Sequence, residues 1–211
     1  MKVSLSGLYA ITPSGMDRQL LLCKVEQALK GGAKIIQYRD KQRPAEARYQ
    51  IAQAIKTRCD QHQALLIIND DVSLALKVTA NGVHLGKDDI ALAEARHRLS
   101  NQIIGISCYN KLDKAIAAEK AGADYVAFGR FFPSKSKPDA IQADLELLRE
   151  ARSALSIPIV AIGGITPDNG QLLIDAGAHA VAVIDGLFGQ QDVYASALHY
   201  RNLFNKMKGT K

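Results

Sequence analysis

Three polar side chains at alternate positions, Gln37, Arg39 and Lys41, follow directly on a short apolar run. In an extended chain, residues two apart share a face, so an amide, a guanidinium and an ammonium group point the same way. Their donors and positive charges suit an anion such as a diphosphate. The spacing alone is equally compatible with an ordinary polar exit from a strand.

Acidic residues follow the next two apolar runs. Asn69, Asp70 and Asp71 come after one run, and Asp88 and Asp89 come after the other. Carboxylates at neighbouring strand ends can bind one Mg²⁺, which takes one or two protein carboxylates and completes its shell with water and phosphate oxygens. Beside the basic triplet they predict a magnesium-diphosphate site. The alternative is that Asp71 and Asp89 cap the helices that follow.

Two later regions also favour anions. Ser134, Ser136 and Lys137 belong to a longer loop whose hydroxyl and ammonium groups are typical of a segment that closes over a ligand, although a solvated loop is the alternative. Gly164 and the pair Ile184-Asp185 follow the last two apolar runs. In (β/α)8 barrels the loops after strands seven and eight often bind a phosphate, so a second phosphate site is expected here, although paired glycine also serves tight turns.

Residues for acid–base or nucleophilic catalysis are not found at these positions. No Ser-His-Asp set, glutamate pair or cysteine with a basic partner occurs there. The histidines fall mostly in helices or strand interiors, so we interpret each as a core or surface residue. His84 is the one that could approach the site, but it is not counted among the site residues. Cys108 is interpreted as a small buried apolar residue.

Eight short apolar runs must position these side chains. They cover residues 7–12, 33–39, 64–69, 82–86, 103–108, 125–129, 157–163 and 178–184. Their near-continuous apolar character is typical of parallel strands that are covered on both faces. Segments of helical period lie between them, such as Leu21, Val25, Ala28 and Leu29.

A weak internal repeat supports the same alternation. Segments 30–33, 120–123 and 175–178 each end in Gly-Ala, where glycine suits the left-handed residue after a helix and alanine begins the next strand. Eight such units without a linker predict a single (β/α)8 TIM barrel over residues 1–211. A doubly wound, flavodoxin-like sheet is the alternative.

Composition excludes several classes of protein. With 211 residues and 47% hydrophobic content, the chain can bury a sizeable core and is not a disordered protein. Three unpaired cysteines argue against a disulfide framework and favour a cytoplasmic location. Neither a signal peptide nor a membrane span is expected. The net charge of +6 is interpreted as a basic surface without a nucleic-acid stripe, compatible with phosphorylated small molecules.

Taken in order, these strand-end residues resemble those of the thiamine-phosphate synthase family, whose members join a hydroxymethylpyrimidine diphosphate to a thiazole phosphate. The matching segments lie within 37–41, 68–71, 82–89, 105–107, 122–126, 133–137 and 162–165. Each segment is short, and their combination is what makes the resemblance specific. It implies a TIM barrel, a transferase of thiamine biosynthesis and Mg²⁺ as cofactor. A homo-oligomer is compatible with the sequence.

The resemblance also implies roles by position. The pyrimidine diphosphate would be held by Gln37, Arg39, Lys41, Asn69 and Lys137, of which Arg39, Lys41 and Lys137 would act on the leaving group. Asp70 and Asp89 would bind Mg²⁺, and Ser107 would line the pyrimidine pocket. The thiazole phosphate would face Ser134, Ser136, Gly164, Ile184 and Asp185.

Three positions depart from the family pattern. Ser134 and Ser136 stand where the family usually has threonines, which keeps both hydroxyls, and Arg130 stands where a small residue or proline is common. Asp185 stands where a serine often donates to the phosphate. At an effective dielectric near 20, a carboxylate about 4 Å from a phosphate charge costs on the order of 4 kcal/mol, so we expect Asp185 to turn away or to be screened by a cation.

The residue inventory suits the implied reaction. Departure of diphosphate leaves a cation that the aminopyrimidine can delocalise, and the attacking thiazole nitrogen carries no proton, so no side-chain base is required. The related thiazole tautomerases need a histidine base two residues past Ser107, where this chain has Tyr109. Sugar-phosphate isomerases need acid–base groups that are not found. A non-catalytic phosphate-binding barrel remains an alternative, but it would need no magnesium-diphosphate site.

Overall fold

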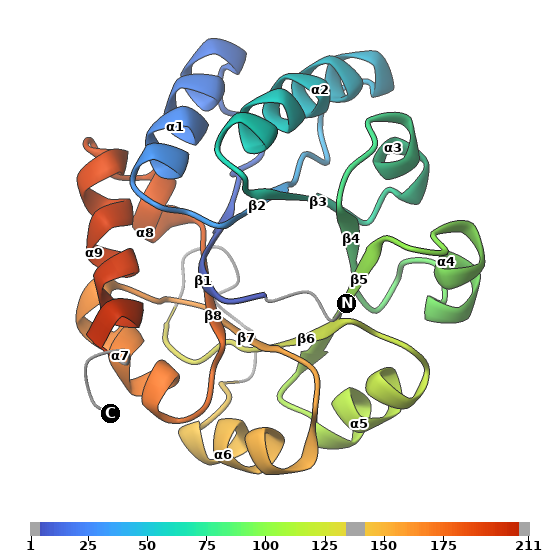
Figure 1. The fold of residues 1–211 in the computed structure, drawn as a ribbon, viewed down its shortest axis with the longest axis vertical. Coiled ribbons are helices and arrows are strands. Elements are labelled where there is room, and N and C mark those ends of the chain that lie inside the picture. The colour runs from blue at the N-terminus through green and yellow to red at the C-terminus, as the bar shows by residue number, and fades with distance from the viewer. Residues whose placement is uncertain (1–4, 134–141, 207–211) are drawn as a thin grey trace.

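The computed structural model describes residues 5–133 and 142–206, which form a closed barrel of parallel strands surrounded by helices (Figure 1). The strands are β1 (Gly7–Ile11), β2 (Ile35–Tyr38), β3 (Leu65–Asn69), β4 (Gly82–Leu85), β5 (Ile103–Tyr109), β6 (Tyr125–Phe128), β7 (Ile159–Ile162) and β8 (Ala180–Val183). The helices are α1 (Arg18–Lys30), α2 (Ala45–Gln61), α3 (Val72–Lys77), α4 (Leu92–Arg98), α5 (Leu112–Lys120), α6 (Leu145–Ala154), α7 (Pro167–Asp175), α8 (Asp185–Phe188) and α9 (Val193–Lys206).

The order of the strands confirms the predicted (β/α)8 barrel. Each strand pairs in parallel with its neighbour in the sequence, and β8 pairs with β1 to close the barrel. Closure rules out the doubly wound sheet, which would have two open edges. All eight apolar runs form strands, most of them shorter than the run that predicted them.

Two separate apolar layers hold the barrel together. Side chains that alternate along each strand point inward, where Tyr9, Ile35, Ile67 and Tyr125 belong to one buried cluster. The intervening side chains point outward and pack against the helices in a second, larger cluster that includes the predicted Val25. The strands are therefore covered on both faces, which explains their near-continuous apolar sequences.

The Gly-Ala repeat forms the same turn three times. Gly32, Gly122 and Gly177 have positive φ angles of 103°, 92° and 119°, a backbone region that favours glycine. The N–H group of the alanine that follows each glycine bonds to the carbonyl oxygen five residues earlier, at 2.9–3.0 Å. This 6→1 bond is that of a Schellman turn, so the repeat ends a helix and starts the next strand in the same way each time.

Two further features concern the reactivity of the three cysteines and the question of a membrane-spanning helix. The three cysteines are free, and burial raises the pKa of both the Cys59 and the Cys108 thiols to about 12, so neither is an activated nucleophile. Within the described residues, no helix is long and apolar enough to cross a membrane.

Candidate active site

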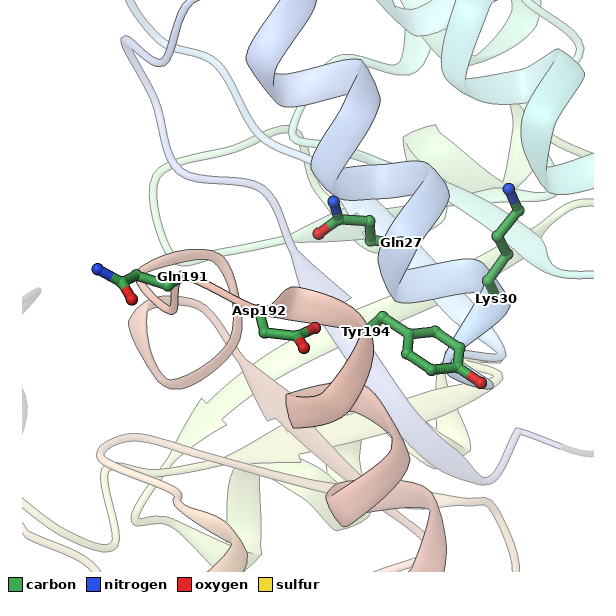
Figure 2. A pocket seen from close by; sticks show the side chains of 5 residues that line it. All are labelled: Gln27, Lys30, Gln191, Asp192 and Tyr194. Carbon is green, nitrogen blue, oxygen red and sulfur yellow. The ribbon is translucent and has the colours of Figure 1, made fainter.

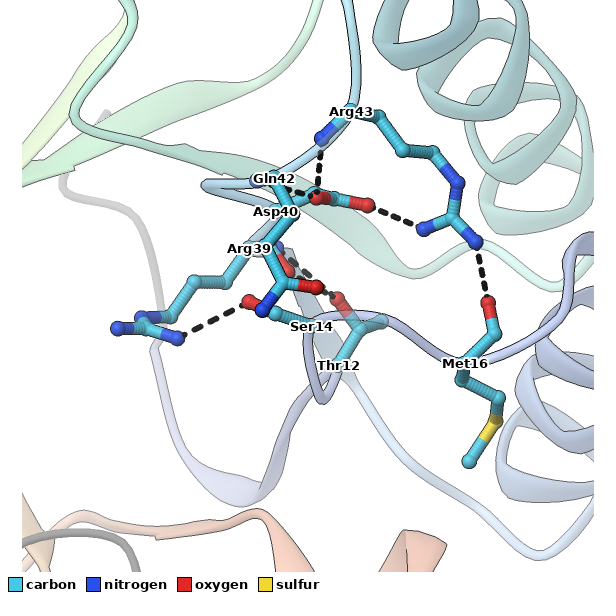
Figure 3. Close-up of polar contacts among 7 residues, drawn as sticks. All are labelled: Thr12, Ser14, Met16, Arg39, Asp40, Gln42 and Arg43. Carbon is cyan, nitrogen blue, oxygen red and sulfur yellow. Dashed lines mark hydrogen bonds and ion pairs between the residues drawn. The ribbon is translucent and has the colours of Figure 1, made fainter.

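The loop after β2 presents its basic residues in a fixed arrangement (Figure 3). Arg39 donates from Nη1 to Ser14 Oγ at 3.2 Å, and its backbone N–H donates to Thr12 Oγ1 at 2.9 Å. Both partners lie in or beside the end of β1, so the loops after the first two strands are joined. Figure 3 shows the Arg39 side chain on one side of its loop and that of Arg43 on the other.

Asp40 is the buried anchor of this loop. Its carboxylate accepts hydrogen bonds from the backbone N–H groups of Gln42 and Arg43 at 3.0 and 3.2 Å, and it forms an ion pair with the Arg43 guanidinium. Burial works to raise the pKa of the Asp40 carboxyl, but the hydrogen bonds from Gln42 and Arg43 outweigh it and hold the pKa below its usual range. Arg43 also donates to the carbonyl oxygen of Met16, which ties this loop to the one after β1.

The two carboxylates predicted to bind magnesium lie together at the ends of β3 and β4. Lys41 Nζ lies 2.9 Å from Asp70 Oδ2. Burial and the hydrogen-bonded carboxylate of Asp70 both raise the pKa of Asp89, against a 2.6 Å hydrogen bond from the Gly86 N–H. Asp70 has a φ angle of +65°, the left-handed region that aspartate enters more readily than most residues.

This pair passes a simple test of fit for a divalent cation. Two carboxylates in contact repel each other, and a cation between them would relieve that repulsion. Within residues 5–133 and 142–206 no set of three or more His, Cys, Asp or Glu side chains could hold a metal ion. Among the described residues, the candidate site offers the carboxylates of Asp70 and Asp89, a number that suits Mg²⁺ bound together with phosphate oxygens and water.

The capping alternative is correct for one aspartate and wrong for the other. Asp71 is the N-cap of α3, where it accepts from the Leu74 N–H at 2.9 Å and pairs with Arg48 at 3.1 Å. Asp89 does not cap α4, whose N-cap is Ala91. Asp88 is exposed. The acidic residues therefore divide into a structural cap and the Asp70–Asp89 pair.

A chain of hydrogen-bonded polar groups, partly buried at its Ser107 end, crosses the interior of the barrel. Gln37 Nε2 donates to the Tyr9 hydroxyl at 2.8 Å, and that hydroxyl lies 2.8 Å from the hydroxyl of Tyr125. His84 Nδ1 lies 2.9 Å from the Tyr125 hydroxyl, and His84 Nε2 lies 2.9 Å from Ser107 Oγ. Two predicted substrate-binding residues, Gln37 and Ser107, are thus connected through three residues that were not predicted.

Sequence reasoning missed this chain for an identifiable reason. Tyr9 and Tyr125 occur in apolar runs where tyrosine reads as core, and His84 was interpreted as a core histidine, which left its contact with Ser107 unforeseen. The signal that could have revealed the chain is the pairing of residues across neighbouring strands. Asn69 and His84 are paired in the β3–β4 ladder, as are His84 and Gly105 in the β4–β5 ladder, and residues so paired lie side by side across the sheet.

The loop after β7 is packed against the loop after β6. Phe132 N–H donates to the Gly163 carbonyl at 3.0 Å, and a Cβ on Gly164, which has a φ angle of +63°, would lie 2.7 Å from Phe132 O. Asn169 at the start of α7 accepts from Thr166 N–H at 2.8 Å and donates to Gly164 O at 3.1 Å. Glycine is therefore required here by both backbone conformation and space.

Asp185 lies at the start of the short helix α8, and Ile184 is the N-cap of that helix. A Cβ built on Gly189 would lie 2.6 Å from Asp185 Oδ1, so the carboxylate is directed along the helix toward Gly189. The expectation that Asp185 turns away from the phosphate or is screened by a cation stays a prediction. Three other predicted residues, Ser134, Ser136 and Lys137, lie outside the described residues.

Tyr109 occupies the position where a tautomerase would have its histidine base. Its side chain is 38% exposed, its φ angle is +58°, and Lys114 Nζ lies 5.1 Å from the centre of its ring.

A cavity of about 540 Å³ lies away from these residues, against α1 and the start of α9, and is lined by Gln27, Lys30, Gln191, Asp192 and Tyr194 (Figure 2). None of the predicted site residues that the structure describes lines it.

The closed barrel and the polar residues at its strand ends define a (β/α)8 barrel of the kind that binds phosphorylated small molecules. More narrowly, the chain belongs to the thiamine monophosphate synthase family, which residues 8–187 match. It is 56% identical to a thiamine-phosphate synthase from Nitrosococcus oceani over 97% of this chain and 95% of that protein. It is 50% identical to a thiamine-phosphate synthase from Thioalkalivibrio sulfidiphilus over 95% of this chain and 96% of that one.

A solved structure agrees with the sequence relatives. Thiamine phosphate pyrophosphorylase from Pyrococcus furiosus superimposes with a TM-score of 0.87 at 37% sequence identity, covering 95% of this chain and 96% of the other. The family resemblance drawn from the strand-end motifs is thereby confirmed. The roles of the individual site residues remain predictions.

Proposed function

We propose that this chain joins hydroxymethylpyrimidine diphosphate to thiazole phosphate, releasing diphosphate and forming thiamine phosphate. The observation that carries the proposal is the placement of Lys41 beside Asp70, which in turn contacts Asp89. A cationic side chain next to a carboxylate pair suits a diphosphate that arrives with a divalent cation. Family membership supports the same reaction.

The proposed reaction is a substitution at the methylene carbon of the pyrimidine. The bond from that carbon to the diphosphate oxygen breaks, and its electron pair leaves with the diphosphate. The lone pair of the thiazole nitrogen then forms the new carbon–nitrogen bond, and no proton moves. Arg39, Lys41 and Lys137 would neutralise the leaving group, so electrostatic stabilisation and orientation account for the catalysis.

Magnesium is part of the proposal. Asp70 and Asp89 would hold Mg²⁺, which when bound would supply positive charge to the departing diphosphate. Asn69 and Gln37 would bind the pyrimidine half. Gly164 and Ile184 would face the thiazole phosphate through their backbone, and Asp185 lies beside them.

The setting of the reaction follows from the same proposal. We expect small-molecule substrates as the partners, with neither nucleic acid nor a membrane involved, and a cytoplasmic location. A homo-oligomer is compatible with this activity.

The test is product formation by the purified protein from both substrates, with and without Mg²⁺. We expect thiamine phosphate and diphosphate to appear together and only with Mg²⁺. Asp70→Asn and Asp89→Asn should abolish Mg²⁺-dependent binding of inorganic pyrophosphate in calorimetry. Asp71→Asn is the matched control, because asparagine also caps helices well and Asp71 lies outside the proposed metal site.

Two results would contradict the proposal. One is diphosphate release that is independent of Mg²⁺. The other is an equal loss of pyrophosphate binding in the Asp71→Asn control, because the effect would then be one of general destabilisation.

A further inference from the structure

The polar chain inside the barrel runs through five residues on five strands: Gln37 on β2, Tyr9 on β1, Tyr125 on β6, His84 on β4 and Ser107 on β5. Every link is 2.8–2.9 Å long. We call this chain the barrel relay. It begins and ends on residues of the predicted pyrimidine site, while its three middle members have no role in the proposed reaction.

Packing fixes the middle of the relay. The rings of Tyr9 and Tyr125 meet edge to face with centroids 6.1 Å apart, and His84 stacks on Tyr125 at 5.5 Å. A Cβ on Gly105 would overlap the ring of Tyr125, so glycine at this position makes room for the tyrosine. Burial raises the pKa of both tyrosines, so they act as neutral hydroxyl groups.

The relay has two self-consistent directions, because each hydroxyl has a single proton to donate. The orientation of the Gln37 amide selects between them. With Gln37 Nε2 as the donor to the Tyr9 oxygen, the consistent direction would send the Tyr9 proton to the Tyr125 oxygen. In that direction the Tyr125 proton would go to His84 Nδ1, and the histidine proton would lie on Nε2 and be donated to Ser107 Oγ.

We propose that the barrel relay sets the hydrogen-bonding polarity of the pyrimidine site, with Tyr9, Tyr125 and His84 as positioning residues. Ser107 Oγ already accepts a hydrogen bond from His84, so its own proton is directed to the substrate. Ser107 is thereby a donor, and it selects a ring that presents a bare nitrogen acceptor. An aminopyrimidine has such nitrogens, whereas an oxo analogue that carries N–H at the same place would meet a second donor.

This inference rests on the proposed function for the identity of the ring, but its first test does not depend on activity. Protein labelled with ¹⁵N-histidine, without substrate, is studied by proton–nitrogen correlation at a pH where histidine is neutral. The His84 signals are assigned by their loss in His84→Gln. We expect the proton on Nε2 and a bare Nδ1. A proton on Nδ1, or an even mixture of the two tautomers, would overturn the proposal.

The second test breaks the relay at its centre. Tyr125→Phe keeps the ring and removes the hydroxyl that connects Tyr9 to His84. We expect the His84 tautomer preference to be lost and the KM for the pyrimidine diphosphate to rise about tenfold, the factor that corresponds to ~1.4 kcal/mol. The KM for thiazole phosphate should stay unchanged. An unchanged pyrimidine KM, or an equal rise for both substrates, would refute the positioning role.

The matched control is Tyr38→Phe. Tyr38 is also a buried tyrosine, but it belongs to the outer apolar layer, where its side chain interacts with Asp40 and not with the relay. Removal of its hydroxyl should leave the His84 tautomer preference unchanged. In the Tyr125→Phe background, Ser107→Ala should cost less than it does alone, because the relay no longer orients the hydroxyl. Equal costs in both backgrounds would show that Ser107 acts independently.

Failure of this inference can be told apart from failure of the proposed function. If the wild-type protein forms no thiamine phosphate, the proposed function is wrong, and the histidine spectrum still decides the direction of the relay. If the product forms but His84 carries its proton on Nδ1, the polarity proposal alone is wrong.

Discussion

The contribution of Gly164 to the thiazole phosphate site can be tested by comparing two glycine substitutions. Both Gly164 and Gly122 have positive φ angles, +63° and +92°. A side chain in this region costs roughly 1–2 kcal/mol, and Gly164 lies nearer the left-handed minimum, so backbone strain should be no greater there than at Gly122. The surroundings differ. A Cβ at Gly122 meets nothing within 4 Å, whereas one at Gly164 would approach two backbone oxygens, of Phe132 and Pro133.

The expected magnitudes follow from this difference. Gly122→Ala should lower the free energy of unfolding by about 1–2 kcal/mol, from strain alone. Gly164→Ala adds overpacking against backbone that cannot yield easily, which costs typically about 1–3 kcal/mol, so its total should be about 2–5 kcal/mol. The loop after β7 is also expected to shift, and we predict a rise of about tenfold or more in the KM for thiazole phosphate, the factor for ~1.4 kcal/mol of lost binding.

The assay combines urea denaturation with steady-state kinetics in both substrates. Gly122→Ala should leave both KM values unchanged, because Gly122 follows α5 at the opposite end of the barrel units from the strand-end loops. If Gly164→Ala lowers stability as expected but leaves the KM for thiazole phosphate at the wild-type value, the phosphate does not bind at this turn. Equal effects of the two substitutions on KM would refute the packing argument as well.

Three further predictions concern charge and reactivity. Asp185→Ser should lower the KM for thiazole phosphate or leave it unchanged, since it removes a carboxylate beside the proposed phosphate site; a large rise in steady-state assays would show that the carboxylate is useful. Lys137→Ala should lower kcat more than it raises KM, and an unchanged kcat would refute its role on the leaving group. Burial raises the pKa of Cys59 and Cys108 to about 12, so iodoacetamide at pH 8 should alkylate only Cys23 in the folded protein. Mass spectrometry counts the alkylated cysteines. Modification of all three would mean that the barrel opens readily.

Much of the fold could be predicted because it depends on local regularities. The near-continuous apolar runs identified the strands, and the Gly-Ala repeat marked the helix ends where Gly32, Gly122 and Gly177 adopt positive φ angles. Closure of the barrel followed from the number of units, since eight equivalent βα units without a linker leave few other arrangements. These signals are carried by neighbouring residues, which is why a single sequence contains them.

The candidate site could be predicted only for residues that directly follow a strand. Lys41 and Asp70 were placed together because each follows a strand, and their 2.9 Å contact agrees with that placement. The choice between cap and ligand for Asp71 was left open, because it depends on Arg48 and the start of α3, which are set by packing. The connection between Tyr125 and His84 was missed because it joins residues across the barrel, and no local pattern records such a contact.

The ion pair between Asp40 and Arg43 has a consequence for how tightly an anion can be held. With Arg43 bound to the Met16 carbonyl, this pair joins the loops after β1 and β2. The conformational entropy of ordering the segment that carries Arg39 is therefore lost during folding and not during association. If this loop binds a diphosphate as proposed, its rigidity would raise the affinity.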